Sequence, residues 1–184
     1  GKHFPGHGYI QADSHLQISI DQRRYTDIEM NDLVPFQQMI NYGLPGVMPA
    51  HVIYPKVDQH PAGFSNIWLQ KILRTELQFE GCIFSDDLSM QGAADYLESI
   101  VMRAQAALHA GCDMILICNN LKGVDEVLNK LYWEMSATSL SRLARMHARD
   151  NFESMAKLRE NGDYIRAVRE ISIIGCETGD LPLQ

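Results

Sequence analysis

The residues best suited to chemistry lie at the start of the chain, in the stretch GKHFPGHGYIQADSH at positions 1–15. Asp13 and His15 are two positions apart, and residues with this spacing point to the same side of an extended segment. A carboxylate that bonds one imidazole nitrogen fixes the tautomer of the ring and raises its basicity, so the pair could transfer protons near neutral pH. The alternative is that Asp13, Ser14 and His15 form a polar turn that caps the next element.

A second candidate is the pair of acids in the apolar run CIFSDDLSM at positions 82–90. Because successive residues of a strand point to opposite faces, only one of Asp86 and Asp87 can enter a site shared with the first segment. A carboxylate fixed at a strand end suits displacement at an acyl or glycosyl carbon, with the carboxylate as nucleophile and an Asp-His unit as general acid and base. The alternative is that these acids cap the following helix.

A metal site is a further possibility, because His3, His7, Asp13, His15 and His51 are all ligand types. Their spacing within a loop rich in Gly and Pro matches no tight ligand motif such as HExxH. We therefore expect no metal and no other cofactor.

The elements that must position these residues alternate along the chain. Short strands that are apolar at every position, separated by amphipathic helices, are typical of a parallel sheet covered by helices. The reactive residues follow the strands, at the end of the sheet where α/β barrels and open sheets place their sites. The pattern predicts strands at 46–55, 82–90 and 112–119, helices at 33–40, between Ser65 and Gly81, at 92–109 and at 122–135, and further helices after 136 that are broken at Asn161 and Gly162.

Composition limits the class of protein. A chain of 184 residues that is 46% hydrophobic and 21% charged is long enough to bury a core as one domain. With 16 basic and 23 acidic residues the net charge is −7, which argues against nucleic acid as a partner. No apolar run approaches the roughly 20 residues that cross a bilayer, so we expect no membrane partner. The four cysteines lack metal spacing and fit a reducing compartment, which predicts a cytoplasmic location.

Four motifs in order, KHFPGHG, Asp13-Ser14-His15, MPAHVIYP and IFSDDLSM, resemble the bacterial β-N-acetylhexosaminidases of glycoside hydrolase family 3, the cytoplasmic type that acts in peptidoglycan recycling. The resemblance covers residues 1 to about 120. It implies a retaining exo-β-N-acetylglucosaminidase that removes terminal N-acetylglucosamine from muropeptides. Its carbohydrate substrate is therefore the expected partner.

The same resemblance assigns roles to individual residues. Asp86 would attack the anomeric carbon and form a covalent glycosyl-enzyme. His15, oriented by Asp13, would protonate the leaving oxygen and then deprotonate water. Lys2 and His3 would hold hydroxyls of the sugar.

The resemblance also implies a fold, the (β/α)8 TIM barrel. Because the family's barrel is about twice as long, this chain is expected to be the C-terminal half, strands 5 to 8, of a single partial domain. Residues 1–135 would form the barrel units and 136–184 extra C-terminal helices, and the missing N-terminal half of the barrel would be a partner. The remaining alternatives are a truncated remnant that is inactive or binds sugar weakly, and a related β-glycosidase or phosphorylase.

Overall fold

The computed structural model describes residues 1–10, 19–147 and 154–174. They belong to two compact units, residues 1–147 and residues 148–184. The predicted division of the chain between residues 135 and 136 falls inside the first unit.

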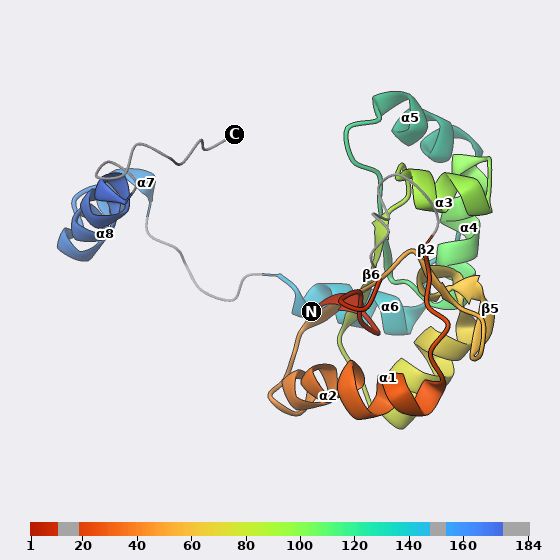
Figure 1. The fold of residues 1–184 in the computed structure, drawn as a ribbon. Helices are drawn as coiled ribbons and strands as arrows, with labels where there is room; N and C mark the ends of the chain where they lie inside the picture. The colour runs from red at the N-terminus through yellow and green to blue at the C-terminus, as the bar shows by residue number, and fades with distance from the viewer. Residues whose placement is uncertain (11–18, 148–153, 175–184) are drawn as a thin grey trace. The chain divides into compact units, whose positions relative to one another are not determined.

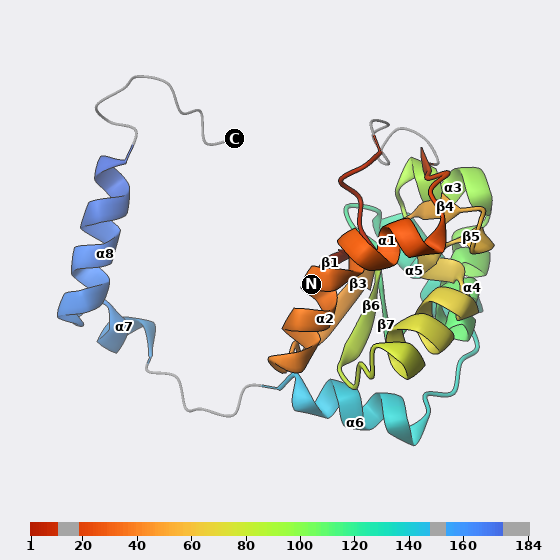
Figure 2. The same cartoon turned by 60° about the horizontal axis from the view of Figure 1, so that its bottom comes forward.

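The first unit is organised around a parallel sheet of four strands in the order β1-β3-β6-β7. Figure 2 shows these strands side by side in that order. They are β1 Lys2–Phe4, β3 Gly46–Pro49, β6 Cys82–Asp87 and β7 Met114–Leu116. All run the same way, so the carboxyl ends of β1, β3 and β6 meet along one edge. The predicted α/β fold with a parallel sheet is confirmed.

A second, smaller sheet consists of β2 Ser19–Ile20, β4 Val52–Tyr54 and β5 Asp58–Pro61, with β4 in the centre (Figures 1 and 2). The stretch 46–55, predicted as one strand, is therefore two strands in different sheets. The chain leaves the first sheet after Pro49, where the Ala50 N–H donates to the Phe4 carbonyl at 2.8 Å and the Ala50 carbonyl accepts from Gly63 at 3.2 Å. His51 lies on this link, between the two sheets.

Helices pack against the main sheet and build the core. The Trp68 ring is fully buried, with the Tyr54 ring 5.0 Å and the Phe4 ring 6.0 Å away, centroid to centroid. The helix predicted at 92–109 is two helices, because Leu97 and Ser99 have extended backbone. The helices are α1 Tyr25–Asn31, α2 Leu33–Asn41, the 3₁₀ turn Ala62–Phe64, the π-helix Ile67–Glu76, α3 Gln91–Tyr96, α4 Ile100–Ala110, α5 Leu121–Lys130 and α6 Ala137–Arg145.

Helix α6, which the prediction grouped with the C-terminal helices, lies across the end of the main sheet in Figure 2. The buried Asp113 binds it there. One Asp113 carboxylate oxygen accepts from Ser139 Oγ at 2.7 Å and from Arg142 Nη1 at 3.2 Å, both on α6. The other oxygen accepts from Arg74 Nη2 at 2.8 Å and from the Ile83 N–H at 2.9 Å. This network closes the end of the sheet opposite to the reactive residues.

The second unit contains α7 Met155–Leu158 and α8 Gly162–Ile173. The predicted break at Asn161 and Gly162 is the start of α8, where the Asn161 side chain accepts hydrogen bonds from the N–H groups of Asp163 and Tyr164. In neither unit do the described residues include a helix with the length and apolar character needed to cross a bilayer.

Candidate active site

Asp86 lies at the carboxyl end of β6 and faces His3 on β1. Its Oδ2 is 3.7 Å from His3 Nε2, and its Oδ1 accepts a hydrogen bond of 2.8 Å from the Asp87 N–H. The Asp86 side chain is 14% exposed and that of His3 33% exposed. One carboxylate oxygen is thus held by the backbone, while the other faces an imidazole in a partly open position. The predicted nucleophile and one predicted sugar ligand come together from separate strands.

Asp87 has different surroundings from Asp86. Its Oδ1 accepts from the Ser89 N–H at 2.9 Å, from Ser89 Oγ at 2.7 Å and from the Cys118 N–H at 2.9 Å. These bonds join the end of β6 to the loop after β7. Asp87 therefore holds the strand end together, which fits the expectation that only one of the two acids serves the site.

His51 is buried behind this strand end. Its Nε2 is 3.1 Å from the Asp87 carbonyl oxygen, and its ring stacks on Phe64 with 5.3 Å between centroids. Burial lowers the pKa of His51, and this effect outweighs the nearby negative charge of Asp86, which acts in the opposite direction. The imidazole is therefore neutral near pH 7 and donates its Nε2–H to the carbonyl. From the sequence, His51 was considered as one ligand of a possible metal site and as a polar residue that follows an apolar stretch.

Lys2 and His3 are neighbours in β1 but lie in different places. His3 approaches Asp86, whereas Lys2 borders a surface hollow of about 230 Å³ together with Pro35 and Phe36 of α2. The structure thus brings His3 to Asp86 and places Lys2 along α2. The role of each in holding sugar stays a prediction.

Asp13 and His15 lie outside the described residues, but the chain on both sides of 11–18 is placed. The Arg23 guanidinium lies 4.3 Å from the centroid of the Tyr9 ring and pairs with the Asp21 and Asp32 carboxylates at 2.7 Å each. These hydrogen bonds raise the pKa of Arg23. Arg23 thus contacts residues that precede and follow the segment with the predicted acid-base pair.

Sequence reasoning assigned Arg23 to a loop and gave it no function. Arg23 is two positions from Asp21, so a contact between these two could be expected from the sequence. Tyr9 and Asp32 lie farther from Arg23 along the chain, and no periodic pattern of residues links them to it.

Gly6 lies against Asp32, one of the partners of Arg23. It has φ +157°, and a Cβ there would clash with the Asp32 carboxylate. Its carbonyl accepts a hydrogen bond of 2.5 Å from the Tyr54 hydroxyl.

Among residues 1–10, 19–147 and 154–174, no three His, Cys, Asp or Glu side chains are placed to hold a metal ion. The His3 and His7 rings lie near each other, with 6.2 Å between centroids. Asp13 and His15, two of the possible metal ligands named from the sequence, lie outside these ranges.

Comparison with known proteins gives a family for this arrangement. Residues 1–146 match the sequence model of the glycosyl hydrolase family 3 N terminal domain. The chain is 58% identical over 183 residues to a protein of Nitrosospira multiformis named beta-hexosaminidase, covering 100% of this chain and 52% of that protein. A beta-hexosaminidase of Thiobacillus denitrificans is 52% identical, over 100% of this chain and 51% of that one.

Solved structures agree with these matches. NagZ from Neisseria gonorrhoeae in complex with N-trifluoroacetyl-D-glucosamine has a TM-score of 0.78 and 40% identity, over 91% of this chain and 47% of that chain. A family 3 β-N-acetylglucosaminidase from Paenibacillus has a TM-score of 0.68 and 28% identity, over 84% of this chain and 33% of that chain. The chain spans about half the length of the curated relatives that it matches.

One expectation from the sequence is overturned here. We expected the C-terminal part of a family enzyme, but the domain that matches is the N-terminal domain, so this placement is wrong. The strand-helix units of a parallel barrel share one sequence pattern, and their number alone does not tell which part of a longer protein they form. The chain is a portion of the (β/α) barrel domain of glycosyl hydrolase family 3, and it belongs to that family.

Proposed function

We propose that this chain provides the catalytic nucleophile of a retaining exo-β-N-acetylglucosaminidase that acts on muropeptides derived from peptidoglycan. The observation that carries the proposal is Asp86 at the carboxyl end of β6, held by the Asp87 N–H and facing His3 across 3.7 Å. The family and its beta-hexosaminidase relatives support the reaction class. The glucosamine derivative held by the Neisseria gonorrhoeae protein supports the sugar.

In the first step, an Asp86 oxygen attacks the anomeric carbon of the terminal sugar and the bond to the leaving oxygen breaks. His15 gives its proton to that oxygen, and Asp13 keeps the imidazole in the correct orientation. In the second step, His15 takes a proton from water, which attacks the same carbon and releases Asp86. Two displacements restore the β configuration, and the Asp-His unit replaces the second carboxylate of most glycosidases.

The position of Asp86 suits the role of nucleophile. The bond from the Asp87 N–H fixes the rotation of the carboxylate, so that Oδ2 is directed away from the backbone. His3 beside it is in place to bind a hydroxyl of a sugar seated over Asp86. We keep Lys2 as a second sugar ligand, and its position along α2 would require the flexible side chain to turn toward β6.

We also propose that the four parallel strands are half of an eight-stranded (β/α)8 barrel, completed by strands that this chain does not contain. In the described part of the chain, β1 and β7 each pair with one neighbour only. A complete barrel leaves no such edges. The strands that this chain does not contain would therefore complete the barrel around the site.

The test is the intact mass of this chain after incubation with 5-fluoro-N-acetylglucosaminyl fluoride, in a mixture with the part of the Nitrosospira multiformis protein that lies outside the aligned region. A single covalent addition that is lost in Asp86→Asn and retained in Asp125→Asn, on the exposed face of α5, supports the nucleophile. No adduct on the wild-type protein would favour the inactive remnant. Formation of sugar 1-phosphate when inorganic phosphate is added would favour a phosphorylase.

A further inference from the structure

We propose that His51 is a positioning residue for Asp86: its Nε2–H holds the Asp87 carbonyl, and thereby the backbone of Asp87, the residue whose own N–H orients the Asp86 carboxylate. The inference deepens the proposed function, because it matters for catalysis only if Asp86 is the nucleophile. Nothing in the sequence pattern or in the relatives' names assigns this role to His51.

The contact is rigid. His51 is 1% exposed and lies on the link between β3 and β4, so its backbone is held by both sheets. Its ring stacks on Phe64 at an interplanar angle of 25°, and Phe64 stacks in turn on Tyr96 at 13°. A ring fixed on one face by an aromatic partner and at Nε2 by a hydrogen bond has little freedom to turn.

The tautomer follows from the partner. A carbonyl oxygen only accepts hydrogen bonds, so Nε2 carries the proton and Nδ1 carries a lone pair. Within the described residues, the buried Nδ1 has no hydrogen-bond partner. A buried acceptor without a partner is unfavourable, so packing alone gives no reason for histidine here. The Nε2–H donor is the feature that an apolar side chain would lack.

Charges around His51 keep it neutral. Asp86 and Asp87 favour the protonated ring and Arg103 disfavours it, but burial dominates and lowers the pKa of His51. A neutral His51 donates a hydrogen bond without placing a positive charge beside the nucleophile. It also takes no part in the proton transfers assigned to His15.

The hydrogen bonds form a relay to the nucleophile. His51 Nε2 lies 3.1 Å from the Asp87 carbonyl oxygen, and the Asp87 N–H lies 2.8 Å from Asp86 Oδ1. Asp87 is also held by its side chain, whose Oδ1 accepts hydrogen bonds from the N–H groups of Ser89 and Cys118. The Asp87 carbonyl also accepts from the Met90 N–H at 3.2 Å, so loss of the His51 donor would leave it with a single donor on a turn. Residue 87 would then be held less firmly, and the bond that fixes Asp86 would be disturbed.

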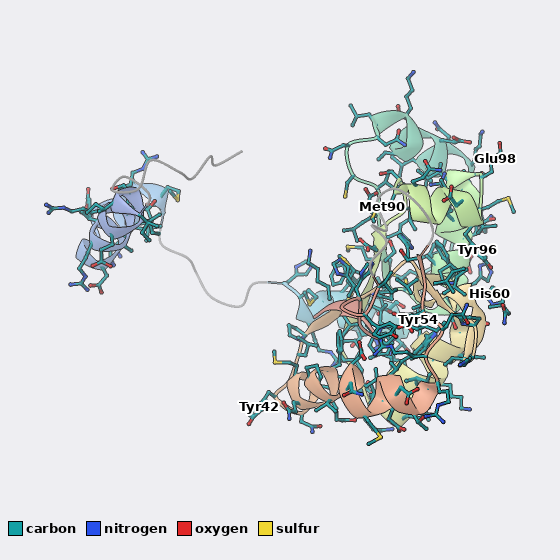
Figure 3. All side chains as sticks on the ribbon, viewed as in Figure 1. Tyr42, Tyr54, His60, Met90, Tyr96 and Glu98 are labelled. Carbon is teal, nitrogen blue, oxygen red and sulfur yellow. The ribbon has the colours of Figure 1, made fainter. Side chains whose placement is uncertain are left out.

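The experiment compares His51→Leu, which lacks the donor, with His51→Gln, which keeps an N–H. His60→Leu is the matched control, because His60 is an exposed histidine bonded to Asp58 on β5 and lies beside Tyr96 at the rim of the unit (Figure 3). Imidazole ¹⁵N shifts report the tautomer, and amide exchange of the Asp87 N–H reports its bond to Asp86. Neither measurement requires activity. The rate of adduct formation with the fluoro sugar is the catalytic measurement.

We expect the neutral Nε2–H tautomer near pH 7, because burial lowers the pKa of His51. His51→Leu should speed Asp87 amide exchange and slow adduct formation, each by about tenfold or more, without a matching loss of sugar affinity. His51→Gln should restore most of both, and His60→Leu should change neither.

An Nδ1–H tautomer, or unchanged Asp87 exchange in His51→Leu, overturns the positioning role. If wild type forms no adduct but Asp87 exchange responds as expected, the proposed function of Asp86 in this chain fails while the relay stands. If His51→Leu speeds Asp87 amide exchange and slows adduct formation, but His51→Gln restores neither rate, the effect comes from packing and the donor role is wrong.

Discussion

Asp87 illustrates, at the residue scale, how groups that do not react hold the candidate site. Its carboxylate accepts hydrogen bonds from Ser89 and from the Cys118 N–H, and so joins the ends of β6 and β7. We expect Asp87→Asn to lower the free energy of unfolding by about 1–3 kcal/mol, because a neutral amide oxygen accepts the bonds from Ser89 and Cys118 more weakly than a charged carboxylate does. Urea unfolding measures this loss.

The exposed Asp125→Asn on α5 is the control and should change stability by less than about 0.5 kcal/mol. Asp87→Asn should also keep the covalent adduct at a reduced rate, whereas Asp86→Asn abolishes it. Equal loss of the adduct in both variants would contradict the separate roles of the two acids.

From the sequence, candidate residues could be selected one by one, but their contacts could not be predicted. Asp86 was recognised because strand ends in a parallel sheet carry functional groups, and His51 was noted for the same reason. The contact of His51 with Asp87, 36 positions away, depends on the crossing of the two sheets. No local pattern encodes that crossing, so the sequence could not predict the hydrogen bond of His51.

At the scale of elements, Arg23 connects the strand β2, the helices α1 and α2 and the segment before residue 11. It pairs with the buried Asp21 and with Asp32, and stacks on Tyr9. Arg23→Met would leave Asp21 buried without its counter-ion, so we expect a loss of about 3 kcal/mol in unfolding free energy. Amide exchange at Tyr9, Ile10 and Asp21 should accelerate, as measured by hydrogen-exchange mass spectrometry.

The adjacent Arg24 provides the matched control. Its ion-pair partner among the described residues is Asp27 of α1, at 3.2 Å, and its side chain is 71% exposed. Arg24→Met should therefore cost less than about 1 kcal/mol and leave exchange near Tyr9 unchanged. Equal effects of the two substitutions would show that the Arg23 pairs contribute no more than a surface ion pair.

Helices and strands with a single clear hydrophobic period were predicted well, whereas elements whose ends depend on tertiary contacts were not. The helix at 33–40 corresponds to α2, and the runs at 82–90 and 112–119 contain β6 and β7. The stretch 46–55 is apolar throughout, and only pairing partners divide it between β3 and β4. The extended link between α3 and α4 carries no Gly or Pro to announce it.

At the scale of the whole molecule, the sheet of the first unit has two open edges in the described part of the chain. Strand β1 pairs only with β3, strand β7 pairs only with β6, and Met114 on β7 is 41% exposed. Open parallel edges and exposed apolar strand residues favour association or misfolding. The relatives that the chain matches are about twice as long, which is enough for further strands.

We therefore expect the purified 184-residue chain by itself to hydrolyse 4-nitrophenyl N-acetyl-β-glucosaminide at a negligible rate, because it spans about half the length of its relatives and the proposed barrel would lack the rest of its rim. Light scattering should show associated species, because no described strand covers the outer edges of β1 and β7. Adding the part of the Nitrosospira multiformis protein that lies outside the aligned region should restore turnover. The same mixture made with Asp86→Asn should stay inactive, which separates assembly from chemistry. Full turnover by a monomer of this chain would contradict the need for further strands, because it would require the described sheet to complete the sugar site without them.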